Sequence, residues 1–223
     1  MAQSIMPKAK PILLVTFCLA LIAGSGWSIW RTQFADPQIN LTLHRAVARV
    51  MAEETVKLLN GSGKVVVIAI ELAGEPELKV QLDEFERALK PHPKIELHKT
   101  YKLETDDKLK YSFGSGLSGR RLVRIVNKTP GTDLYVSFLG APALSESELA
   151  ELKSTPRLLA EARAADKLRK PFEQKLLQTA IVSRFQFPNP VAGTPGTPKE
   201  WFDQRWQIVS AANVKELPSG KAE

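Results

Sequence analysis

Two short runs of apolar and β-branched residues most constrain the fold of this chain: Val65–Ile70, with the sequence VVVIAI, and Leu134–Leu139, with the sequence LYVSFL. Neither run alternates with polar residues, so each predicts a strand that is buried on both faces. Strands of this kind occur inside parallel sheets, where helices cover both faces of the sheet. The two runs therefore predict the centre of an α/β domain.

The segments around these runs alternate between helix and strand patterns, which predicts a parallel sheet with helices on both faces. The strand Ile95–Leu103 alternates apolar with polar residues and is placed at an edge of the sheet. The pattern of Arg157–Ala162 fits a strand or a helix, and this choice stays open. The other predicted elements are helices over Thr42–Leu59, Glu77–Lys90 and Ser118–Val126, a helix marked by Leu168, Phe172 and Leu176, and strands over Thr179–Phe185 and Gln207–Val214.

These elements predict an α/β fold with a doubly wound parallel sheet of about five strands in the order 2-1-3-4-5. Two capping boxes mark helix starts: Ser145 with Glu148, and Thr197 with Glu200. The predicted organisation is a cytoplasmic N-terminus (1–10), a transmembrane anchor (11–30), a linker helix (31–62) that packs on the sheet, the α/β domain (63–187), and a Pro-rich linker with a short helix and a polar tail (188–223).

An uncharged run from Pro11 to Trp30 follows Lys8 and Lys10. A helix of about 20 residues covers about 30 Å, the thickness of the hydrocarbon core of a bilayer. The preceding lysines predict a cytoplasmic N-terminus and an extracytoplasmic, periplasmic-side domain. The lipid bilayer is thus an expected partner of residues 11–30. The alternative is a signal peptide cleaved before Gly26, which also places the domain outside the cytoplasm.

The net charge of +7 comes from lysines and arginines that are interleaved with acids. Basic groups at Lys108–Lys110 and Arg120–Arg124 lack interleaved aromatic residues, so we expect no nucleic-acid partner. They are interpreted as solvated faces, with weak attraction to anionic lipid headgroups as the alternative. The single cysteine, Cys18, excludes an intramolecular disulfide.

The glycines from Gly114 to Gly119 match G-x-G-x-x-G, but they follow the second strand of the domain instead of the first. The pattern is therefore interpreted as a glycine loop with a helix cap rather than a dinucleotide site. The three histidines have no ligand partner at metal-binding spacing, and there is no nucleophile elbow. We expect no metal, no cofactor and no catalytic residues.

The segments VVVIAIE and TDLYVSFLGAPALS carry a resemblance that extends over residues 63–187. With the intervening helix, alternating strand and second helix, the chain resembles one lobe of the type I periplasmic-binding-protein fold, that of the sugar-binding receptors of ABC transport. Such receptors close two lobes over a ligand, and this chain has residues for one. The resemblance implies binding of a small, sugar-like ligand as one possible function.

In a doubly wound sheet, ligands bind where the strand order reverses. A ligand would therefore contact loops after the first and third strands and the start of the second domain helix. The candidate ligand-binding residues are Glu71, Gly74, Glu75, Gly114, Gly116, Ser118, Gly140, Ala141 and Ser145. The aromatic residues Trp201, Phe202 and Trp206 predict a helix packed on the sheet, with a partner-binding surface as the alternative.

Three functions follow from these observations. The preferred one is a membrane-anchored extracytoplasmic domain that acts as a non-enzymatic accessory subunit of a membrane complex, with a membrane protein as partner. The alternative is a small-ligand, sugar-like binding module. A nucleotide- or flavin-binding enzyme is the second alternative.

Overall fold

The structure is a computed structural model that describes residues 9–29, 41–71, 76–104, 116–162, 165–184 and 196–216. Contacts divide the chain into two compact units, Met1–Ile39 and Asn40–Glu223. The second unit contains every strand of the sheet, and helices that precede and follow the predicted 63–187 segment also belong to it.

The first unit contains helix α1, Ala9–Ile29. Its described large apolar side chains, among them Phe17, Ile22 and Trp27, are each more than half exposed. Within the part of the chain that the structure describes, no helix combines the length and apolarity needed to cross a membrane. The predicted anchor Pro11–Trp30 lies partly outside the described residues, because Trp30 and the side chains of residues 11–14 and 16 do not belong to them.

The second unit is built on a six-stranded sheet with the order β2-β1-β3-β4-β5-β6. The predicted order 2-1-3-4-5 is confirmed, and all four pairs within it are parallel. The sixth strand is antiparallel to β5 and closes one edge, while β2 forms the other edge as predicted. The strands are β1 (Gly63–Glu71), β2 (Ile95–Glu104), β3 (Leu134–Ser137), β4 (Leu158–Ala162), β5 (Leu177–Ser183) and β6 (Trp206–Ser210).

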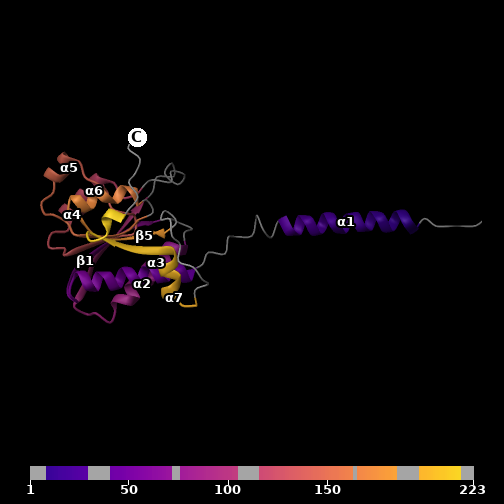
Figure 1. Cartoon of the computed structure of the whole chain (residues 1–223), viewed down its shortest axis with the longest axis horizontal. Helices are drawn as coiled ribbons and strands as arrows, with labels where there is room; N and C mark the ends of the chain where they lie inside the picture. Colours follow the sequence, from indigo (N-terminus) through magenta and orange to yellow (C-terminus); the bar gives the residue numbers. More distant parts are fainter. Residues whose placement is uncertain are drawn as a thin grey trace, which may run out of the picture. The chain divides into compact units, whose positions relative to one another are not determined.

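Helices cover both faces of this sheet (Figure 1). Helices α2 (Leu41–Leu58), α3 (Pro76–Leu89) and α7 (Pro198–Arg205) lie on one face. On the other face lie α4 (Gly119–Lys128), α5 (Glu146–Ala150), α6 (Arg169–Glu173) and two short 3-10 helices, Asp166–Leu168 and Val214–Glu216. The packing of α2 on the sheet, predicted for the linker helix, is confirmed.

Consecutive residues of β1 point to opposite faces and enter two separate cores. Val66 and Ile68 join the cluster under α4, whereas Val65 and Val67 join the cluster under α2 and α3. All four side chains are at most 1% exposed. This two-sided burial explains why the β1 sequence has no polar positions between Val65 and Ala69.

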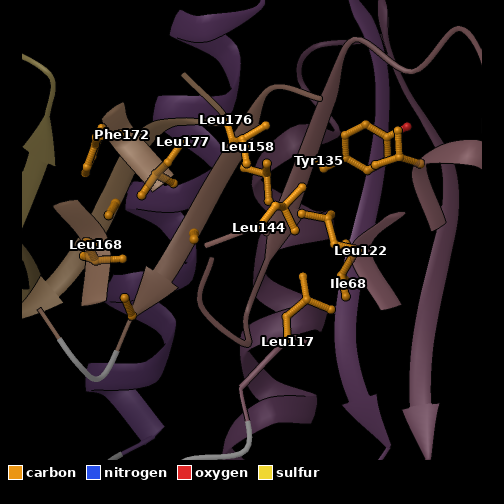
Figure 2. Close-up of a cluster of buried hydrophobic side chains, with 14 of the residues drawn as sticks. Ile68, Leu117, Leu122, Tyr135, Leu144, Leu158, Leu168, Phe172, Leu176 and Leu177 are labelled. Carbon is orange, nitrogen blue, oxygen red and sulfur yellow. The ribbon is translucent and has the colours of Figure 1, made fainter. Parts of the chain in front are cut away.

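The core under α4 is centred on Ile68, Leu122, Tyr135 and Leu158, which Figure 2 shows pointing toward one another between the sheet and the helix layer. The ring of Tyr135 is 2% exposed, and its hydroxyl finds a partner in Thr129. The Tyr135 hydroxyl lies 3.1 Å from Thr129 Oγ1 and 3.2 Å from the Thr129 carbonyl oxygen. A polar atom inside an apolar core is thereby satisfied.

Several local predictions are refined by the structure. Arg157–Ala162 contains a strand, β4, since Leu158, Leu159 and Ala160 are fully buried between β3 and β5. The helix predicted around Leu168, Phe172 and Leu176 is only a 3-10 turn followed by α6, because Lys175 adopts a φ of 58° and ends it before Leu176.

Of the three C-terminal aromatic residues, Phe202 lies on the core side of α7. Phe202 is 3% exposed and stacks on Trp206, with ring centroids 6.0 Å apart. The prediction that this segment packs on the sheet is confirmed for Phe202, which is therefore unavailable to a partner. Trp206 is the first residue of β6 and is not part of the helix. The guanidinium carbon of Arg205 lies 5.5 Å from the centroid of the Trp201 ring.

Val67 provides a test of the two-sided sheet, because its side chain is enclosed by α2, α3 and the neighbouring strands. Val67→Asp should abolish cooperative folding, since it buries an unpaired carboxylate. Val67→Ala should fold and lose about 1–2 kcal/mol of unfolding free energy in urea titrations. The control Lys90→Asp, on an exposed residue after α3, should change this free energy by no more than about 0.5 kcal/mol. A folded Val67→Asp protein would contradict this packing.

Candidate functional site

The strand order reverses between β1 and β3, so the candidate site lies at their carboxyl ends. From β1 the chain crosses through α3 to β2 at one edge, and returns through α4 to β3 on the other side of β1. The ends of the two strands are joined directly, because the Phe138 backbone N–H donates to the Ile68 carbonyl at 2.9 Å. The polypeptide after β3 is thereby fixed against the end of β1.

Five of the predicted ligand-binding residues have described positions, namely Gly116, Ser118, Gly140, Ala141 and Ser145. Glu71 is the last residue of β1, but its side chain lies outside the described residues. Gly74, Glu75 and Gly114 also lie outside them. The described part of the site therefore consists of the loop after β3 and the start of α4.

These two segments contact each other through their backbones. The Leu117 N–H donates to the Leu139 carbonyl at 2.9 Å. A Cβ atom on Gly116 would lie only 2.7 Å from the same carbonyl oxygen, which explains the glycine at this position. Gly140 follows with a φ of +81°, so it turns the loop in a conformation that favours glycine.

The loop after β3 is also held by hydrogen bonds from the buried side chain of Ser137. The Ser137 hydroxyl donates to the Gly140 carbonyl at 2.7 Å and accepts from the Leu139 N–H at 3.2 Å. Ser137 itself is fully buried. The predicted residues Gly116, Ser118 and Gly140 thus come together on two short segments that a buried serine and a backbone hydrogen bond hold in place.

Ser118 is the N-cap residue of helix α4, but its side chain makes no capping hydrogen bond. The carboxylate of Glu148 lies at this helix start instead, where the charge and the backbone N–H of Arg120 help to lower its pKa. A Cβ atom on Gly119 would lie 2.6 Å from both Glu148 carboxylate oxygens, so the glycine makes room for them.

The same carboxylate caps α5. It accepts from the Ser145 N–H at 2.9 Å and from the Ser145 hydroxyl at 3.1 Å, and the Ser145 hydroxyl accepts from the Glu148 N–H at 3.3 Å. The capping box predicted for Ser145 is therefore confirmed. Glu148 therefore lies at the starts of both α4 and α5. Its position at α4 gives no signal in the sequence beyond the glycine at 119.

The pKa of Glu148 lies below its ordinary value of 4.5, first because the Ser145 backbone N–H donates to the carboxylate. Burial is the next-largest effect and opposes this change, while the Ser145 hydroxyl, the charge of Arg120 and the Arg120 N–H each lower the pKa by a smaller amount. The carboxylate is thus ionised at neutral pH and occupies the positive N-terminal end of α4.

A separate groove of about 590 Å³ lies between α2 and α3 and is lined by Arg49, Lys57, Glu84, Arg87 and His92 among others. Glu84 is 5% exposed and forms ion pairs with Arg49 and with Arg87, the latter at 2.6 Å. Burial raises the pKa of Glu84, but hydrogen bonds from Arg87 and Arg49 outweigh it and leave the pKa below 4.5. These charges satisfy one another, and none of the predicted site residues lines this groove.

Metal-ligating side chains do not cluster in the described ranges: no group of three or more His, Cys, Asp or Glu residues there could hold an ion. At the strand ends the described polar groups are backbone amides and carbonyls, the hydroxyls of Ser118 and Ser145, and the carboxylate of Glu148, which already caps α5. This arrangement offers both hydrogen-bond donors and hydrogen-bond acceptors, and its carboxylate lies against the starts of both α4 and α5.

The sequence matches no protein-family model and no curated protein sequence. Solved structures do match: a solute-binding protein of an ABC transporter from Burkholderia graminis in complex with D-arabinose (TM-score 0.52, 20% identity), an arabinose-binding protein from Geobacillus stearothermophilus (0.54, 14%) and a sugar ABC transporter protein from Actinomyces odontolyticus (0.55, 13%). The fold is periplasmic-binding-protein-like.

These matches cover 78–79% of this chain but only 62–64% of the solved chains. The chain therefore spans less than two thirds of the length of the proteins it resembles. At such identities the likeness concerns the fold. It confirms the resemblance to the sugar-binding receptors that the β1 and β3 segments indicate.

The position of the Glu148 carboxylate at the starts of α4 and α5 predicts that its contribution to stability depends on pH. Glu148→Gln should lower the melting temperature at pH 7 by about 2–4 °C, as expected for a loss of about 1 kcal/mol from a capping interaction. Because the folded pKa of Glu148 is depressed, this difference should be fully present above the ordinary carboxyl pKa of 4.5 and should vanish as pH falls through the lower, folded value.

The matched control is Glu146→Gln, an exposed residue in the first turn of the same helix. It should shift the melting temperature by less than half as much, because the dipole of α5 is its main partner. Equal effects of the two substitutions at all pH values would show that Glu148 has no special role in joining α4 to α5.

Proposed function

We propose that the chain is a binding module for a small, uncharged, sugar-like ligand, and that the ligand binds at the carboxyl ends of β1 and β3. The observation that carries this proposal is the junction of residues 116–118 with residues 138–140 at the point where the strand order reverses. Gly116 lets the two segments approach through the Leu139 carbonyl, and Gly140 carries no side chain in the loop, so a ligand could approach the backbone closely there.

The electrostatics of this junction favour an uncharged ligand over a nucleotide. The N-terminus of a helix near a switch point is the usual place for a phosphate, but at α4 the Glu148 carboxylate already takes that place. A phosphate placed beside it would meet a like charge. A polyhydroxylated ligand can instead exchange hydrogen bonds with neutral groups such as the Ser118 hydroxyl. Among the solved proteins of this fold, one is a solute-binding protein in complex with D-arabinose and another is an arabinose-binding protein.

Ligand binding can be measured on the full chain in detergent by its melting temperature. We expect one of a panel of neutral aldopentoses and aldohexoses to raise it by about 5–10 °C at a concentration near 100 times Kd, where binding stabilises by about 2.7 kcal/mol. The corresponding sugar phosphate should give a smaller shift. No response to any neutral sugar would contradict the proposal.

Ser118→Phe tests the location of this site. The Ser118 side chain is exposed and makes no capping bond, so the bulky ring should leave the fold intact and block the ligand. The matched control is Ser62→Phe, on an exposed serine before β1 at the opposite end of that strand. The sugar response should be lost in the first variant and retained in the second. Retention in both would place the ligand elsewhere.

A second candidate function is that of a membrane-attached, extracytoplasmic accessory domain. It is favoured by α1, whose described apolar side chains remain exposed around the helix and would be unstable in water. Attachment of α1 to a bilayer would cover them. The two candidates are compatible, because a binding module can be held at the membrane by a separate helix.

Carbonate extraction tests the membrane attachment. We expect the full chain to stay in the membrane fraction, and an epitope added after Glu223 to be accessible to protease from outside the inner membrane. Deletion of residues 1–30 should release the protein to the soluble fraction. Recovery of a soluble wild-type chain that begins near Gly26 would show that the segment is a cleaved signal peptide.

A further inference from the structure

Helix α4 carries a one-sided basic surface. Four of its ten residues are Arg120, Arg121, Arg124 and Lys128, and all four side chains are exposed. With 100° between consecutive helical residues, they fall within an arc of about 100°. The opposite side is formed by Leu122, Val123, Ile125 and Val126, which are buried in the core (Figure 2 shows Leu122). We call these four cations the α4 basic face.

Most of this face has no internal counter-charge. Glu148 lies beside Arg120 and interacts with it, but among the described residues no ion pair engages Arg121, Arg124 or Lys128. The other side of the sheet differs, since Glu84 there pairs with both Arg49 and Arg87. Within the described residues, two guanidinium groups and one ammonium group are therefore available to an external anion.

Hydrogen bonds attach the C-terminal end of α4 to the rest of the domain. The Thr129 hydroxyl at the end of α4 donates to the Ile125 carbonyl at 2.8 Å and contacts the buried Tyr135 hydroxyl. The side chain of Asn127 bonds the backbone of Glu151 and Lys153, each at 2.9 Å, so the exposed Lys153 continues the basic surface beyond the helix.

We propose that the α4 basic face docks on an anionic membrane surface. This inference rests on the proposed membrane attachment through α1. Eleven residues separate the end of α1 at Ile29 from the start of α2 at Leu41. A segment of that length spans at most about 40 Å, so an attached domain would stay close to the headgroups. At such a short range, weak attraction per residue becomes effective because association is intramolecular.

An extended, multivalent anion fits this face better than a single small one. The four cations are spread over about two turns of helix and do not converge on one point, whereas lipid headgroups present negative charge across a plane. Each Lys or Arg near an anionic surface contributes about a fivefold preference for the docked state, so three residues together contribute on the order of 100-fold.

The experiment uses the full chain in vesicles of phosphatidylcholine alone or with about one-third phosphatidylglycerol. In a Cys18→Ser background, a fluorophore at Ser154→Cys, next to Lys153, reports energy transfer to a headgroup dye. We expect strong transfer only in the anionic vesicles, and loss of transfer at about 0.5 M salt because the charges are screened. A fluorophore at Glu86→Cys, on exposed α3 across the sheet, should show weak transfer in both.

Arg121→Gln/Arg124→Gln/Lys128→Gln should lower the ratio of docked to undocked protein by on the order of 100-fold while leaving melting temperature unchanged. The control Lys79→Gln/Lys90→Gln/Lys94→Gln removes the same charge from exposed residues on and after α3 and should have less than a tenth of this effect. Equal loss in both variants, or transfer that ignores lipid charge and salt, would overturn the proposal. Flotation with neutral vesicles reports on α1 separately, so a failed attachment is distinguishable from failed docking.

Discussion

The burial of β1 on both faces is the constraint on which the rest of the structure depends. Its successive side chains enter two cores, with Val66 and Ile68 on one side and Val65 and Val67 on the other. Each buried aliphatic side chain contributes about 1.5–3 kcal/mol relative to exposure, so neither face can be left to solvent. Helices from both ends of the second unit are therefore required: α2 comes from before β1, and α7 follows the last parallel strand.

The central strands could be predicted because their signal is local. A run such as VVVIAI specifies burial on both sides without reference to any other segment. The strand β4 could not be assigned in the same way, since LLAEA suits a helix equally well and only its neighbours decide. Tyr135 on β3 and Ala180 on β5 pair with residues of β4, and these contacts join positions far apart in the sequence. The antiparallel β6 likewise depends on how α7 returns the chain to the sheet edge.

The candidate site shows the same division between local and tertiary information. The capping box of Ser145 and Glu148 follows a sequence rule and was predictable. The second use of that carboxylate at Arg120 requires α5 to approach α4, and no residue pattern encodes that approach. Gly116 and Gly119 are informative only in retrospect. Each leaves room for one specific acceptor, the Leu139 carbonyl in one case and the Glu148 carboxylate in the other.

Helix α4 has two positive features, the N-terminal end of its dipole and its basic side chains, and they lie on different parts of its surface. Its N-terminal dipole is satisfied from within by Glu148, which closes the usual anion position beside the switch point. Its arginines point away from the core and have no role in that junction apart from Arg120. Under the two proposals, an anion attracted by the helix is directed to the outer face, whereas the described backbone and hydroxyl groups at the strand ends offer a ligand neutral hydrogen bonds. Two surfaces of one ten-residue helix can in this way serve different partners without competing.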